Sequence, residues 1–207
     1  RHRHGHGERF PPPAAHPERG ARTANLAVAL HTAAISSGDP DTLDEALNAA
    51  RAAVTTARAG TPDHALRLSN LGPILRSRYD RNGAVDDLDD AIAALRDAVA
   101  AAAPDHPDQP ARLSNLGDLL RVRCEHQQNR ADLDEAVTLH THAVSTGHRT
   151  HPDRPGHLSN FGSALQSRAH LAELHGADPS ADLDHAIAAL SEAVELNPPD
   201  APNRYLY

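Results

Sequence analysis

Apolar residues along this chain recur at intervals of three and four, the spacing that places side chains on one face of an α-helix. One such stripe runs from Leu68 to Tyr79, and a second runs from Leu88 to Val99. Pro62 and the acid after it mark the start of the first helix, since Pro lacks only an N–H that a first turn leaves unpaired. The pattern therefore predicts two amphipathic helices joined by a turn.

This two-helix pattern returns every 45 residues, in register with the phrase LSNLG at 68–72 and 113–117 and LSNFG at 158–162. The register divides the chain into units 16–60, 61–105, 106–150 and 151–200 and a truncated fifth unit, 201–207. Residues 1–15 match no part of the unit, and their Arg, His, Gly and Pro content predicts a disordered lead-in or linker. One hairpin cannot bury both of its apolar stripes, so neighbouring hairpins must stack. The predicted fold is all-α, an α-solenoid of stacked antiparallel helical hairpins.

Two columns of the repeat carry predictions about the helices themselves. The second helices are expected to begin at an N-cap residue, in the column of Thr42, Asp87, Asp132 and Asp182. A Gly in mid-helix costs roughly 1 kcal/mol, yet the first helices keep one in the column of Gly72, Gly117 and Gly162. This retention predicts that another helix backbone passes close to the glycine.

Unit four is longer than the others, and its extra residues are expected to lengthen its first helix and to form a protruding loop near 175–180, without disturbing the stack. The fifth unit stops before its apolar phrase, so the apolar face of the helix around 183–194 is left without its usual cover. We therefore expect end-to-end self-association through this face, with Leu183, Ile187, Leu190 and Val194 near the contact.

The unit resembles the tetratricopeptide repeat (TPR). That family has Asn-Leu-Gly in its first helix, here residues 70–72, and Ala, a bulky residue and Ala in its second helix, here Ala91, Leu95 and Ala98. The unit of this chain is longer than the family's. More closely, the phrases HPDRP, LSNLG and DLDEA are similar to the long TPR-like arrays that precede CHAT domains in actinobacterial and fungal proteins. The resemblance implies a TPR-like right-handed superhelix and a role in protein–protein interaction.

Composition narrows the classes of function. The formal net charge is -8, so no basic field favours nucleic acid. No apolar run reaches the length of a membrane span. We therefore expect neither nucleic acid nor a membrane as a partner, and a cytoplasmic location. The chain has no Met, which predicts a fragment or a processed chain, and Arg in place of Lys with much Ala, Pro and His is typical of actinobacterial coding.

Chemistry-bearing residues form no catalytic or metal-binding pattern in the sequence. There is no Gly-rich phosphate loop, and acids such as Asp87 recur with the repeat. The 16 histidines lack the converging spacing of a metal site. His140 replaces an apolar residue of a second helix and is expected to be half-buried with a hydrogen-bond partner, while Cys124 is expected to be a small core residue. We expect no enzymatic activity, no catalytic residue, no cofactor and no metal.

Repeated polar columns on the first helices supply the candidate partner-binding residues. One column is Asn25, Asn70, Asn115 and Asn160; in TPR domains the matching Asn often bonds the backbone or terminal carboxylate of a bound peptide. Two basic columns contribute Arg67, Arg112, Arg76 and Arg121, and a further one is Arg78, Arg123 and Arg168. Guanidinium groups suit carboxylates. The alternative for each column is internal, with Asn bonded to a neighbouring repeat and Arg paired within the array.

The sequence thus predicts a non-enzymatic protein-interaction scaffold that binds its partner on a concave surface formed by the first helices. The expected partner is a protein or peptide, either acidic or with a free C-terminus. The alternative function is a regulatory or sensor segment of a CHAT-type, caspase-like protease, whose catalytic domain would lie beyond Tyr207.

Overall fold

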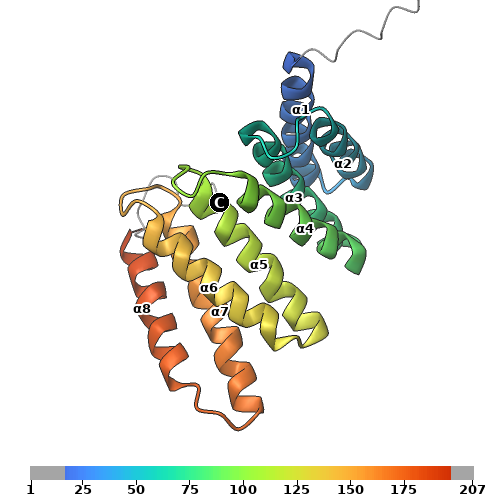
Figure 1. The fold of residues 1–207 in the computed structure, drawn as a ribbon. Coiled ribbons are helices and arrows are strands. Elements are labelled where there is room, and N and C mark those ends of the chain that lie inside the picture. The colour runs from blue at the N-terminus through green and yellow to red at the C-terminus, as the bar shows by residue number, and fades with distance from the viewer. Residues whose placement is uncertain (1–16, 197–207) are drawn as a thin grey trace, which may run out of the picture.

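The computed structural model describes residues 17–196, which fold into eight α-helices (Figure 1). In chain order these are α1 (Pro17–Ser37), α2 (Pro40–Thr55), α3 (Pro62–Asn82), α4 (Val85–Ala101), α5 (Gln109–Gln127), α6 (Arg130–Thr146), α7 (Arg154–Leu174) and α8 (Ser180–Leu196). The odd-numbered helices are the first helices of the four units and the even-numbered helices are the second helices. No strand occurs between residues 17 and 196, and the all-α prediction is confirmed.

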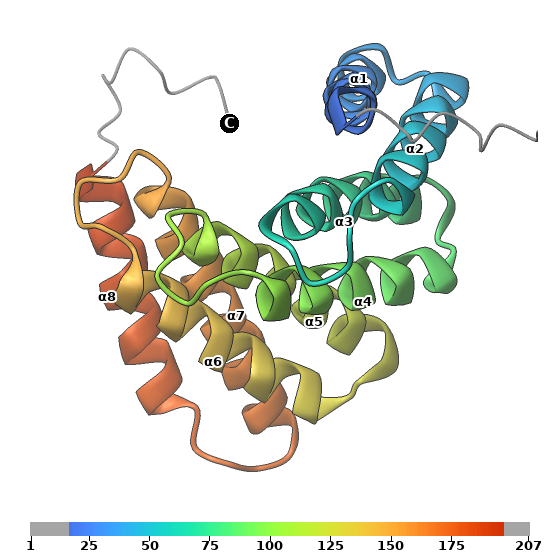
Figure 2. The same ribbon diagram turned by 45° about the horizontal axis from the view of Figure 1, so that its top comes forward.

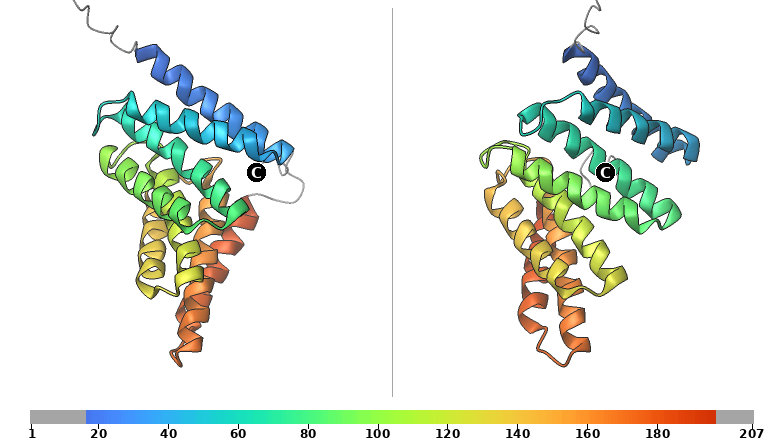
Figure 3. Two further views of the ribbon diagram at one scale, coloured as in Figure 1. Left: turned by 90° about the vertical axis from the view of Figure 1, so that its right-hand side faces the viewer. Right: turned by 45° about the vertical axis from the view of Figure 1, so that its right-hand side comes forward.

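Successive hairpins stack in chain order and turn relative to one another, so the array is a helical solenoid (Figures 2 and 3). Each first helix contacts the second helix of its own unit, the second helix before it and the first helices of adjacent units. Within residues 17–196 the second helices of adjacent units do not approach one another in this way. Because first helices lie closer to their neighbours than second helices do, the array curves toward the first-helix layer. This layer is the concave side.

Apolar columns of the repeat form the core between the helices. In the second helices, Leu43, Leu88 and Leu133 occupy one column and are almost completely buried. Leu75 and Leu120 of the first helices belong to one continuous cluster, which joins units one to three. Burying a Leu side chain contributes about 1.5–3 kcal/mol, so stacking supplies the stability that a lone hairpin lacks.

The glycine column lies against side chains and not, as predicted, against a helix backbone. A Cβ added at Gly72 would lie 2.8 Å from Leu95 Cγ, which is closer than real carbon contacts allow. The equivalent residue of the second helix fills the space over each glycine. The pairs are Gly72 with Leu95, Gly117 with His140, and Gly162 with Leu190. Glycine is therefore needed because one bulky side chain of the same hairpin reaches the first helix at this point.

The second helices begin three residues earlier than predicted. Their N-cap residues are Asp39, Ala84 and Asn129 in the first three units. The Asp39 carboxylate accepts a hydrogen bond from the backbone N–H of Thr42 at 3.0 Å, as an N-cap residue does. The predicted cap residues Asp87 and Asp132 lie inside the first turn instead, where both are buried. Their carboxylates accept hydrogen bonds from Arg78 and Arg123 of the first helices instead.

The extra residues of unit four form a loop, as predicted, but the prediction of a longer first helix is wrong, because α7 has 21 residues, as α1 and α3 do. Helix α7 ends at Leu174 and α8 begins at Ser180, so residues 175–179 form a loop, whereas only residues 128–129 separate α5 from α6. Residues 173–178 are exposed, and the hairpin on either side of the loop keeps its packing. The insertion therefore lengthens the turn and leaves the stack intact.

The two ends of the described array expose columns that are buried inside it. Leu183 and Ile187 of α8 are 41% and 64% exposed, whereas the equivalent Leu88 and Ile92 of α4 are 0% and 1% exposed. The predictions about residues 1–15 and 201–207 concern parts of the chain outside the described residues.

Candidate functional site

The asparagine column runs along the first helices α1, α3, α5 and α7. Asn25 and Asn115 are exposed, and Asn70 and Asn160 are half-buried. Asn160 Nδ2 donates to Ser114 Oγ of the preceding unit at 3.2 Å, which is the internal role that the sequence left open. Within residues 17–196 the other three side-chain amides have no hydrogen-bond partner. Three of the four asparagines in the column therefore have side-chain amides without a partner among the described residues.

Arg67 and Arg112 are directed into the array. Their side chains are each only 4% exposed. The Arg67 guanidinium donates to the Ala53 carbonyl at the end of α2 at 2.7 Å, and to Asp63 at 2.6 Å. Arg112 donates to Ser69 Oγ of the preceding unit at 2.9 Å. The structure thus places these two candidate residues at the interfaces between units, where they satisfy polar groups of the array.

Arg76 and Arg121 are half-buried and linked to each other through one acid. Arg76 donates to Asp118 of the next unit at 2.9 Å, and Arg121 donates to the same carboxylate at 2.8 Å. Each also pairs with an acid one turn further along its own helix, Asp80 or Glu125. The paired carboxylates raise the pKa of Arg76 against the effect of its burial. Both cations are therefore neutralised by acids of the array.

The remaining basic column explains why Asp87 and Asp132 recur. Arg123 of α5 donates two hydrogen bonds to Asp132 of α6, at 2.7 and 2.8 Å, and one to Asp89 of the preceding α4, at 3.0 Å. One guanidinium therefore joins its own hairpin to the one before it. The same arrangement occurs three times, with Arg78 between Asp87 and Asp44, Arg123 between Asp132 and Asp89, and Arg168 between Asp182 and Asp134.

Sequence analysis recognised this column but not its partner. A signal was present, because unit one lacks both members together: Ala33 stands in the Arg column and Thr42 in the Asp column. Another column was missed entirely. Gln109 Nε2 donates to the Val99 carbonyl at 3.2 Å, and Arg154 Nη1 donates to the Val144 carbonyl at 2.9 Å. These side chains satisfy the last carbonyls of the preceding second helix, which would otherwise lack partners.

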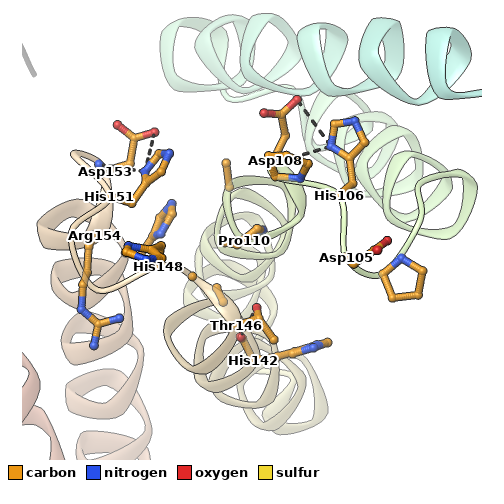
Figure 4. A pocket seen from close by; sticks show the side chains of 16 residues that line it. Asp105, His106, Asp108, Pro110, His142, Thr146, His148, His151, Asp153 and Arg154 are labelled. Atoms are coloured by element: carbon orange, nitrogen blue, oxygen red, sulfur yellow. Dashed lines mark hydrogen bonds and ion pairs between the residues drawn. The ribbon is translucent and has the colours of Figure 1, made fainter.

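A pocket of about 630 Å³ lies where the loop before α5 meets the loop before α7 (Figure 4). The C-terminal end of α6 forms its remaining wall. Five histidines line it, namely His106, His142, His148, His151 and His157. Three carboxylates also line it, those of Asp105, Asp108 and Asp153, together with the side chain of Arg154. No sequence signal identified this pocket, because its two loops are 45 residues apart and meet only in the stack.

Backbone N–H groups donate hydrogen bonds to the Nδ1 atoms of three histidines in the pocket's loops. His106 Nδ1 accepts from the backbone N–H of Asp108 at 3.1 Å, and His151 Nδ1 accepts from that of Asp153 at 3.2 Å. His148 Nδ1 accepts from the backbone N–H of Thr150 at 3.3 Å.

His140 departs from its prediction. It is fully buried and neither ring nitrogen has a hydrogen-bond partner within residues 17–196, whereas half-burial with a partner was predicted. Burial lowers its pKa to about 4, because the charged imidazole would lose its hydration without gaining a partner. Its ring occupies the space over Gly117 that Leu95 fills over Gly72. Cys124 is buried, as predicted.

Among residues 17–196, no group of three or more His, Cys, Asp or Glu side chains is arranged to hold a metal ion, the histidine pocket included. Within the described part of the chain, none of the helices has the length and apolar character needed to cross a membrane.

Comparison with known proteins connects the fold to TPR-like repeats. No protein-family model matches the sequence, and no curated protein matches it either. The structure is similar to two crystal structures of a candidate kinesin light chain from Podosopora anserina with nearly identical TPR-like repeats. One has a TM-score of 0.54 at 19% identity over 88% of both chains, and the other, of a variant of the same protein, has a TM-score of 0.56 at 18% identity over 88% of both chains. MamA is a more distant likeness, with a TM-score of 0.47 at 19% identity over 86% of this chain and 81% of that one. The fold is a TPR-like helical-repeat solenoid.

Proposed function

We propose that the array is a non-enzymatic scaffold that binds an extended peptide segment of a partner protein along its concave first-helix layer. One observation carries this proposal: Asn25, Asn70 and Asn115 form a periodic row of side-chain amides without partners among the described residues. A side-chain amide offers both a donor and an acceptor, which matches the peptide backbone of an extended ligand. TPR-like folds are commonly protein-interaction scaffolds, which supports the same reading.

The polar columns beside this row favour recognition of the backbone over recognition of acidic groups. Arg67 and Arg112 are buried, and Arg76 and Arg121 are already paired with acids of the array. An acidic partner or a free C-terminal carboxylate would have to displace Asp118 from Arg76 and Arg121. An acidic partner or one with a free C-terminus is therefore a more specific proposal than an extended peptide segment. A cytoplasmic location is a separate prediction.

The test is a peptide-array screen followed by affinity measurement with the Asn70→Ala, Asn115→Ala double variant. Losing hydrogen bonds to a bound backbone is expected to weaken binding roughly tenfold or more. Asn48→Ala is the matched control, because Asn48 is an exposed Asn on the second helix α2. Unchanged affinity in a folded double variant would move the site away from the concave row.

A second candidate function is a regulatory or sensor segment of a CHAT-type protease, and it rests only on the phrases HPDRP, LSNLG and DLDEA. It predicts that the gene encodes a caspase-like His and Cys downstream of this segment. Reading that gene decides between the two candidates, since a scaffold requires no such pair.

We also propose that the array associates head to tail with a second copy, α8 of one against α1 of the other. Leu183, Ile187 and Val194 are exposed at one end. At the other end Leu26 is 53% exposed, although its equivalents Leu71 and Leu116 are buried against the preceding unit. Inside the array, the apolar residues of these columns are buried where one unit packs on the next. The exposed face of α8 and the exposed face of α1 correspond to the two surfaces of such a contact, so they can pack on each other.

Light scattering over a concentration series tests this contact. Ile187→Glu and Leu26→Glu should each prevent association, while an equal mixture of the two variants should form dimers, because one intact pair of faces remains. If Ile187→Glu abolishes association and Leu26→Glu does not, the contact is a symmetric one between two α8 faces.

A further inference from the structure

The interior of hairpin three (α5–α6) contains an imidazole that no described group compensates. His140 of α6 is 0% exposed, and both of its ring nitrogens are buried without a hydrogen-bond partner in the described part of the chain. The ring lies over α5, since a Cβ added at Gly117 would be 2.7 Å from its Nε2 atom. Buried polar groups are nearly always paired. Hairpin three therefore carries a titratable group where hairpins two and four have Leu95 and Leu190.

The apolar core is interrupted at the same place. Leu95 belongs to the cluster that runs through units one to three. In α6 this cluster ends at Ala136, while Val137 belongs to a separate small cluster with residues of α7 and α8. A third small cluster, around Leu158, completes the packing of α7 on α8. The core of hairpin four is therefore not continuous with that of hairpins one and two.

Hairpin four (α7–α8) depends on hairpin three for its place in the array. Among the described helices, α7 and α8 approach only each other and the two helices of hairpin three. On the other face of α8, Ile187 and Val194 are exposed. Because the stability of a repeat array is a sum over hairpins and their nearest-neighbour contacts, a change that displaces α6 also removes the support of α7.

The charged and titratable groups that face His140 come from the helices packed on either side of α6. They are Asp118 and Arg121 of α5 and His157 of α7. Burial lowers the pKa of His140 to about 4; the Asp118 carboxylate opposes this effect, and Arg121 and His157 add to it. Asp118 already accepts hydrogen bonds from Arg76 and Arg121. A proton on the buried ring is therefore left without a partner, and the ring binds it favourably only in contact with water.

We propose that hairpin three is an acid-sensitive joint, at which protonation of His140 separates α6 from α5 and detaches hairpin four from the array. Hairpins one and two stay folded, because the equivalent residues there, Ala50 and Leu95, are apolar and buried. The step is the transfer of a proton from hydronium to a ring nitrogen that the separation exposes to water, and it reverses when the pH is raised.

This joint would regulate the proposed binding surface. Asn115 lies on α5 and Asn160 on α7, so opening at hairpin three disrupts one half of the asparagine row and lowers the affinity for a partner in acid. The proposal rests on the scaffold function only for this consequence, since the opening itself requires no partner.

Amide hydrogen exchange of the full chain, read by mass spectrometry of its fragments, tests the joint with no partner present. The ring has a pKa of 6.5 when open to water and about 4 when buried. Opening should therefore be roughly 50-fold more frequent at about pH 4.5 than at about pH 7. After correction for the intrinsic pH dependence of exchange, we expect this increase in fragments of α6, α7 and α8, and a much smaller one in α1 to α4.

Two variants separate the charge of the ring from its burial. His140→Gln keeps a polar side chain that binds no proton, so its opening should be equally frequent at both pH values. His140→Leu copies hairpin two and should suppress opening at both. His142→Leu, at an exposed position of the same helix, is the matched control and should keep the full increase in acid.

Two results would overturn the joint. An equal increase of exchange in all eight helices at about pH 4.5 would show that the array unfolds as one unit. An increase in His140→Gln as large as in the natural chain would assign the acid sensitivity to carboxylates instead. Neither result bears on the asparagine row, which the Asn70→Ala, Asn115→Ala variant tests at neutral pH. If the joint opens in acid but that variant binds its partner normally, the joint stands and the proposed binding site does not.

Discussion

Hairpin two (α3–α4) and hairpin three (α5–α6) each have a glycine in the first helix and an Arg–Asp clamp, the arginine that pairs with two aspartates, but they differ in the residue that covers the glycine. Over Gly72 the second helix places Leu95, and over Gly117 it places His140. Both side chains are almost completely buried. The leucine gains from leaving water, whereas the imidazole loses two hydrogen-bonding opportunities without replacement. The same backbone geometry therefore tolerates a destabilising residue, and the cost of that residue depends on pH.

Transferring the histidine to hairpin two should have the largest effect. Leu95→His removes a buried leucine and adds an imidazole without a partner, so we expect a loss of roughly 3–5 kcal/mol in the free energy of unfolding. Chemical denaturation followed by circular dichroism measures it. A loss below about 1 kcal/mol would mean that the space over Gly72 offers the ring a partner.

The pH dependence of the natural chain should be nearly as large. His140 has an ordinary pKa near 6.5 when unfolded and about 4 when folded, so between these values the unfolded chain binds more protons. Its neutral form therefore favours folding fully above about pH 6.5, and this contribution is lost as the pH falls toward 4, by about 3 kcal/mol in total. Subtracting the profile of His140→Leu isolates the residue, because the half-buried His31 and the buried His157, whose pKa values are also lowered, remain in both proteins. Parallel profiles would contradict the assignment.

Making hairpin three resemble hairpin two should stabilise it. His140→Leu copies the pairs Gly72–Leu95 and Gly162–Leu190, and removing the unpaired ring is expected to raise the free energy of unfolding by about 2 kcal/mol at neutral pH. His142→Leu, at an exposed position two residues on, is the control and should change little. Destabilisation by His140→Leu would show that the imidazole has a favourable role inside the array.

Removing the exposed acid that pairs with the clamp arginine of each hairpin should have the smallest effect on stability. Arg123 lies 3.0 Å from Asp89, while Arg78 lies 3.7 Å from Asp44, and both outer acids are well exposed. Asp89→Asn and Asp44→Asn should each cost about 0.5 kcal/mol or less, with the larger loss at Asp89, and the loss should shrink in high salt because exposed pairs are screened. Melting temperatures at two salt concentrations measure both variants, and a larger cost for Asp44→Asn would contradict the geometry.

Much of the fold could be predicted from periodicity alone. The spacing of apolar residues determines which face of each helix is buried, and the repeat of LSNLG determines that hairpins must stack, since these are local consequences of helix geometry and of apolar area. The same register located the loop of unit four. The asparagine column of the candidate site was also identified in this way, because a repeated residue on a repeated helix recurs on one surface.

Other features were decided only when the hairpins packed together. Periodicity could not show that Arg67 is buried while Arg22 in the same column is exposed, since Arg67 packs against the end of the preceding α2 and no described helix lies before α1. It could not pair Arg123 with Asp132 and Asp89 at once, because these residues come from two hairpins. The pocket of His157 likewise forms from loops that are distant in the chain. Sequence determines what each helix can bury, and the neighbour that covers it determines which polar groups are left without partners.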